Sequence, residues 1–72
     1  MKTKDLEPGT HYAGPGGQIR ELVTMDRPVV TYRQESRGPA ARMGHGNIPK
    51  VGEVREMALS AFAFWALGEA AS

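Results

Sequence analysis

The chain has 72 residues, with nine Lys and Arg against eight Asp and Glu, and it contains no Cys. This length allows one small domain, residues 1–72, and excludes a two-domain protein. The absence of Cys excludes disulfide staples, Cys-type zinc sites and thiol nucleophiles, and a net charge of +1 favours neither a nucleic-acid coat nor an acidic tail.

Residues 10–43 are expected to form a small antiparallel sheet of about three strands. A short β-prone piece precedes a Gly-Pro-Gly-Gly turn at residues 14–17. Residues 19–25 and 29–32 follow as two strands, of which the second is the most β-branched stretch in the chain. We expect them to pair as a hairpin, with a connection of three to five residues and Pro28 at the entrance of the second strand.

Residues 34–49 are expected to form a long basic loop rich in Gly and Pro, with a short edge strand around residues 41–43. Loops of this length without structure of their own are uncommon in compact domains and often carry function. The net charge of residues 27–50 is +4, because five basic residues stand against Glu35 alone. This segment is the one local concentration of charge in the sequence.

Residues 50–69 are expected to form one C-terminal helix of about 20 residues. At about 100° per residue, its apolar side chains cover an arc of roughly 220°, which is wider than the stripe that a helix needs to dock on one sheet. A domain this small buries only about 60% of its unfolded surface, so it depends on tight packing or oligomerisation. We therefore expect this helix to bind a second copy of the chain or another protein. The residues predicted for that contact are Val54, Met57, Ala61, Phe62, Phe64 and Trp65.

The basic segment supports an alternative function, nucleic-acid binding. Arginine side chains bind phosphate in a fork-like geometry, and an aromatic ring offers a surface on which a base stacks. The pI of about 8.2 is below the range typical of nucleic-acid-binding domains, so a solvated loop with internal ion pairs is the stronger interpretation. The residues that this alternative assigns to nucleic-acid contact are Arg27, Tyr32, Arg33, Arg37, Arg42 and Lys50.

No arrangement of catalytic or metal-binding residues is recognisable in the sequence. The glycines at residues 14–17 precede a predicted strand, whereas a phosphate loop leads into a helix. His11 and His45 are 34 positions apart and have no carboxylate at ligand spacing. Ser36 and Ser60 have no recognisable His and acid partners. We therefore expect no enzyme activity, no catalytic residue, no cofactor and no metal ion.

The sequence also shows no targeting or membrane segment. Its first residues continue with acid, Pro and Gly instead of an apolar run, unlike a secretory signal peptide. The most apolar segment, residues 57–68, is shorter than the roughly 20 residues that cross a bilayer. We expect a cytoplasmic protein without membrane contact.

About half of the chain resembles small bacteriophage and prophage proteins with an SH3-like curled sheet. The residues that carry the resemblance are the run 6–12, Gly16, Gly17, the strands at 19–25 and 29–33, and the aromatic segment 57–65. The resemblance implies a curled sheet followed by a helix in an α+β domain. It implies no functional residue, because most of that group has no assigned function. The expected function is a non-enzymatic interaction module, an accessory protein of phage type.

Overall fold

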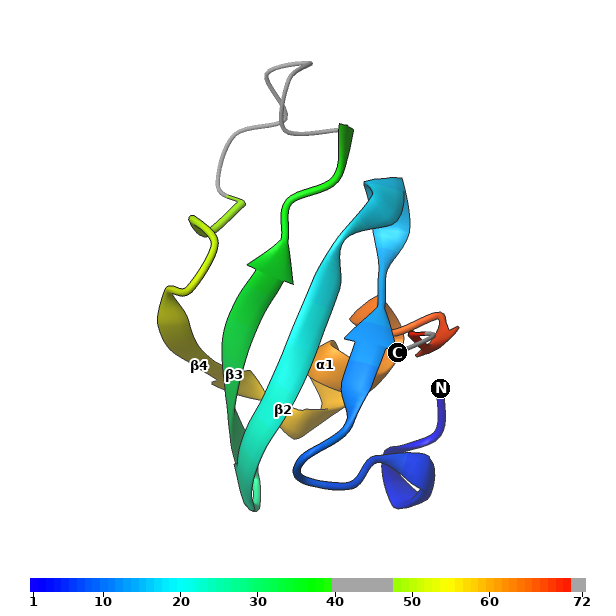
Figure 1. Cartoon of the computed structure of the whole chain (residues 1–72). Coiled ribbons are helices and arrows are strands. Elements are labelled where there is room, and N and C mark those ends of the chain that lie inside the picture. The colour runs from blue at the N-terminus through cyan, green and yellow to red at the C-terminus, as the bar shows by residue number, and fades with distance from the viewer. Residues whose placement is uncertain (40–47, 71–72) are drawn as a thin grey trace.

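The computed structural model describes residues 1–39 and 48–70, which fold into one antiparallel sheet with a short helix against one face (Figure 1). The sheet has five strands in the order β4-β3-β2-β1-β5. The predicted α+β class is confirmed, with five strands instead of about three. The elements in chain order are η1 (Thr3–Asp5), β1 (His11–Ala13), η2 (Pro15–Gly17), β2 (Ile19–Asp26), β3 (Val29–Ser36), β4 (Val54–Ala58), α1 (Leu59–Trp65) and β5 (Gly68–Glu69).

The predicted hairpin forms the centre of the sheet as β2 and β3. Asp26 pairs with Val29, so only Arg27 and Pro28 make the turn, and a cis peptide bond joins them. The expected connection of three to five residues is therefore wrong. The longer connection was expected because neither Asn-Gly nor Asp-Gly stands here, but the pairing of Asp26 with Val29 leaves only two residues for the turn.

The predicted helix over residues 50–69 is wrong in its first half. Gly52 has a φ of +88°, a left-handed conformation that interrupts a right-handed helix. Two residues after Gly52, Val54–Ala58 forms β4, which pairs along its whole length with the edge of β3. Strand pairing satisfies the backbone groups of β3 that would otherwise stay free at the sheet edge. The helix α1 starts only at Leu59 and contains 7 residues.

The predicted loop over residues 34–49 also starts later than expected. β3 continues through Ser36, so the first three residues of that loop belong to the sheet. The edge strand predicted around residues 41–43 lies outside the described residues. In the part of the chain that the structure describes, no helix is long and apolar enough to cross a membrane.

The core lies between α1 and the sheet face that it covers, which we call the inner face. Val30, Tyr32 and Gln34 of β3 are buried there because alternate residues of a strand point to the same side. Phe62 of α1 is 0% exposed, and its ring lies 5.8 Å from that of Tyr12 and 6.0 Å from that of Tyr32, centroid to centroid. The opposite side of the sheet, the outer face, carries the intervening residues.

Candidate functional site

Two of the six residues predicted for partner contact lie on β4 instead of on a helix. Val54 pairs with Arg33 on the outer face and is exposed. Met57 pairs with Val30 on the inner face and packs, half-buried, against the core. The structure therefore places these two side chains on opposite faces of the sheet, and they do not share a surface.

The other four predicted residues lie on α1, and they divide between its two sides. Phe62 is fully buried, and Trp65 packs against it with 5.5 Å between ring centroids. Ala61 is exposed, and Phe64 is 91% exposed. Leu67, which was not among the predicted residues, is 70% exposed just after the helix.

We call the outward set of Ala61, Phe64 and Leu67 the apolar helix surface. Ala61 and Phe64 are three positions apart, a spacing that makes side chains neighbours on a helix. The segment 57–68 contains no Lys, Arg, Asp or Glu, so no charged side chain of its own interrupts this surface. A side chain as large as Phe that is 91% exposed is the type of feature that marks an interaction site.

Arg20 of β2 contacts the side of α1 that faces the sheet. Its guanidinium carbon lies 4.2 Å from the centroid of Trp65 and 4.4 Å from that of Tyr32, so the cation lies between two aromatic rings. Its Nε donates a hydrogen bond of 2.8 Å to Gln34 Oε1, and its Nη2 donates one of 3.4 Å to Gln18 Oε1. Since Trp65 is the last residue of α1, this contact orients the helix so that Phe64 faces away from the core.

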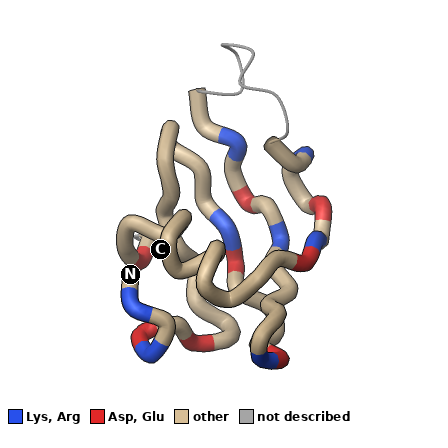
Figure 2. Tube along the Cα trace, turned by 180° about the vertical axis from the view of Figure 1, so that it is seen from behind, with Lys and Arg blue, Asp and Glu red and all other residues tan. Residues whose placement is uncertain are grey.

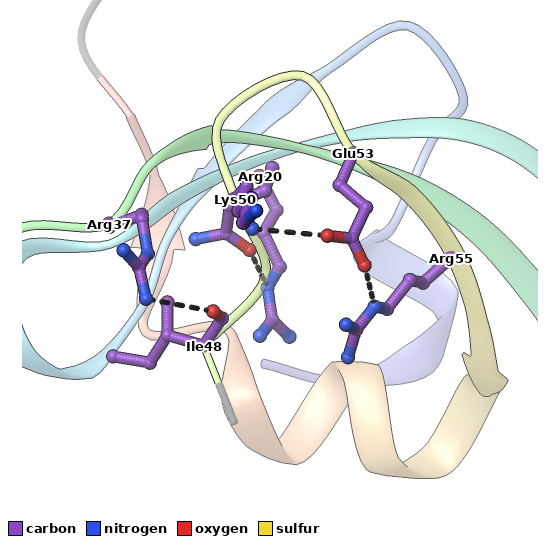
Figure 3. Close-up of polar contacts among 7 residues, drawn as sticks. Arg20, Arg37, Ile48, Lys50, Glu53 and Arg55 are labelled. Atoms are coloured by element: carbon purple, nitrogen blue, oxygen red, sulfur yellow. Dashed lines mark hydrogen bonds and ion pairs between the residues drawn. The ribbon is translucent and has the colours of Figure 1, made fainter. Parts of the chain in front are cut away.

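The electrostatics around Arg20 are unusual because, among the described residues, no carboxylate pairs with it. Burial lowers the pKa of the Arg20 guanidinium from its ordinary value, and the nearby Arg55 also acts to lower it. Figure 3 shows the side chains of Arg20 and Arg55 extending from the sheet in the same direction, with Glu53 bonded to Arg55. Arg20 remains charged at neutral pH, since an arginine side chain does not deprotonate in proteins.

The residues predicted for nucleic-acid contact do not form one surface. Tyr32 is buried beneath Arg20, so its ring faces are not available for base stacking. Arg33 lies on the outer face, where its Nη1 donates to Glu21 Oε1 at 2.6 Å. Arg27 lies in the turn between β2 and β3.

Arg37 and Lys50 lie near the opposite end of β3. Arg37 Nη2 donates to the carbonyl oxygen of Ile48 at 3.1 Å (Figure 3). Lys50 is exposed ahead of β4, and Arg42 lies outside the described residues. Figure 2 shows basic and acidic positions interspersed along the described chain. Of the ion pairs expected within the basic segment and with the acidic N-terminal residues, the one between Arg33 and Glu21 is present among the described residues.

The two candidate serines, Ser36 and Ser60, are not part of a catalytic arrangement among the described residues. Ser36 Oγ accepts a hydrogen bond from the backbone N–H of Gly38 at 3.2 Å, and Ser60 is exposed on α1. Neither is hydrogen-bonded to a histidine among the described residues. Comparison of the chain with known protein families, with curated proteins and with solved structures gave no match.

Proposed function

We propose that this chain is a small non-enzymatic interaction module that associates with a second copy of itself through the apolar helix surface. The observation that carries the proposal is the 91% exposure of Phe64 on a helix whose other aromatic residues are packed against the sheet. Burying a Phe side chain contributes about 1.5–3 kcal/mol, so leaving it in water forgoes a large gain for so small a domain.

The charge pattern supports a second copy as the occupant. A two-fold contact brings the same surface from both copies together, so that surface must be complementary to itself. An apolar surface without charged residues meets this condition, whereas a charged one would repel its copy. The net charge of +1 adds little repulsion between copies.

The strand order β4-β3-β2-β1-β5, with a helix between the last two strands along the chain, supports an SH3-like type of curled sheet. The resemblance of residues 6–33 and 57–65 to phage proteins supports an accessory role of phage type. Nucleic-acid binding through residues 27–50 is the weaker proposal, because Tyr32, Arg33 and Arg27 lie in different parts of the fold.

The test is molar mass by light scattering and sedimentation as a function of protein concentration. A surface built on Phe64 and Leu67 is smaller than a standard interface, so we expect weak association with a Kd on the order of 100 µM. Wild-type mass should rise toward that of a dimer over this range. Phe64→Ser should remain monomeric while keeping its unfolding temperature, since the residue makes few contacts within the fold.

Val51→Ser is the matched control, because Val51 is also apolar and 64% exposed but precedes β4. This variant should associate as the wild type does. A wild-type chain that stays monomeric up to millimolar concentration overturns the self-association proposal. Equal association of the Phe64 and Val51 variants places the contact elsewhere.

A further inference from the structure

The outer face of the sheet brings together a second group of side chains, on the side opposite α1. The register places His11 of β1 opposite Glu21 of β2, and Glu21 opposite Arg33 of β3. A register shift near the start of β2 leaves Glu35 of β3 without a direct partner on β2. Bulges of this kind redirect side chains, and this one brings the Glu35 carboxylate toward the pair formed by His11 and Glu21.

The geometry of these three side chains is close to that of a metal site. One ligand atom from each of His11, Glu21 and Glu35 lies within 4.8 Å of the other two. His11 Nε2 is 3.9 Å from Glu21 Oε2. Around a tetrahedral zinc ion, bonds of about 2.1 Å place ligand atoms roughly 3.4 Å apart. Small side-chain rotations are therefore sufficient for all three residues to bind one ion.

The ligand chemistry selects the type of cation. Calcium and magnesium prefer oxygen ligands only, whereas imidazole nitrogen combined with carboxylate oxygen suits zinc and similar divalent metals. Two carboxylates close together repel each other, and a divalent cation between them removes that repulsion. Arg33 donates to Glu21 Oε1 at 2.6 Å, which leaves Oε2 on the side of His11. A hydrogen bond to the second oxygen is a common way to orient a ligating carboxylate.

We propose that His11, Glu21 and Glu35 form a surface site for a divalent transition metal ion of the zinc type, with its remaining coordination positions open to solvent. No metal site was expected from the sequence, because the three residues come from three different strands and only the sheet register brings them together. The site is independent of the apolar helix surface, since it lies on the opposite face.

The test is isothermal titration calorimetry of the full chain with Zn²⁺ near neutral pH. We expect one ion to bind per chain. His11→Gln and Glu35→Gln should each weaken binding at least tenfold, because each removes one of three protein ligands. Histidine NMR signals should shift at His11 on adding Zn²⁺, and Zn²⁺ should raise the unfolding temperature of the wild type but not of His11→Gln.

Two control variants make the result specific. Glu56→Gln removes another exposed carboxylate from the outer face, and His45→Gln removes the second imidazole of the chain. Both should bind Zn²⁺ with wild-type affinity. The site is wrong if the wild type shows no binding below millimolar Zn²⁺, if His11→Gln binds as tightly as the wild type, or if His45→Gln abolishes binding.

Discussion

Arg20 shows how one buried cation is retained without a carboxylate partner. Moving a charge out of water is expensive, and the protein offsets that cost with two aromatic faces and two glutamine oxygens. A desolvated cation over an aromatic face contributes about 2 kcal/mol, and a hydrogen bond to a charged group about 1.5–3 kcal/mol. A planar guanidinium is required, because a lysine ammonium cannot stack between two rings.

Replacing Arg20 with Ala is expected to lower the free energy of unfolding by about 3 kcal/mol, through lost stacking and an unpaired Gln34 oxygen. Arg33→Ala is the matched control on the outer face, where loss of a partly exposed ion pair costs less than about 1 kcal/mol. Urea denaturation of both variants measures the difference. If Arg20→Ala does not fold, Arg20→Met is compared with Arg33→Ala instead, because methionine retains an apolar side chain that packs where the aliphatic part of Arg20 lies. Equal effects at Arg20 and Arg33 would contradict the stacked-cation role.

Gly14 illustrates a glycine that is required for space instead of for backbone conformation. Its φ of −127° is accessible to any residue, but a Cβ there would overlap the Trp65 ring, with Cη2 only 2.7 Å away. Gly14→Ala should therefore cost about 1–3 kcal/mol by overpacking. Gly68→Ala should change stability by less than about 0.5 kcal/mol, because a Cβ at Gly68 meets nothing within 4 Å.

Thermal unfolding measures the stability of the Gly14→Ala and Gly68→Ala variants. Repeating Gly14→Ala in a chain that also carries Trp65→Phe tests whether the Trp65 ring causes the loss of stability. In Trp65→Phe, the smaller ring leaves space beside Gly14, so the additional cost of Gly14→Ala should fall. A cost that is the same in both backgrounds would show that the Trp65 ring is not what restricts this position.

At the scale of elements, the sequence predicts the hairpin and fails at the C-terminal helix for one physical reason. β2 and β3 are rich in β-branched residues, and local propensity agrees with the final fold there. In residues 50–58 the apolar spacing also fits a helix, but pairing with the free edge of β3 decides the outcome. The residues of that edge lie 21 to 29 positions earlier in the chain than their partners in β4, and periodicity within a short window does not report such a separation.

The candidate sites follow the same division between local and long-range information. Helical periodicity separates Phe62 and Phe64 by about 200° around α1, so burial of Phe62 leaves Phe64 exposed, although the sequence assigned both residues to the partner contact. The Arg20 stack and the group of His11, Glu21 and Glu35 depend on the register of several strands. Register is set by tertiary contacts as well as by pattern, so these groups were not among the predicted sites.

At the scale of the whole molecule, the first residue and the last strand both make backbone contacts that complete the fold: Met1 bonds to α1 and the residue after it, and β5 pairs with β1. The N-terminal ammonium group of Met1 donates to the carbonyl oxygens of Ala63 and Ala66 at 2.8 and 3.0 Å. β5 adds the last edge beside β1, with backbone hydrogen bonds from Leu67 to Ala13 and from Ala70 to His11. β5 has only two residues, so this edge has much less pairing than the central strands.

The unequal pairing predicts a hierarchy of local stability that amide hydrogen exchange measures. The amide of Leu22 is bonded to Thr10 at 2.9 Å in a fully buried part of β2, so it should exchange only on global unfolding. The amide of Ala70 has a bond of equal length to His11, but fraying of β5 should expose it about 100-fold more often. Low concentrations of urea should accelerate exchange at Leu22 and leave Ala70 nearly unchanged, because fraying exposes little surface. Equal protection and equal urea dependence at both amides would instead show that β5 unfolds together with the core, and the short final strand would then contribute to the cooperative unit.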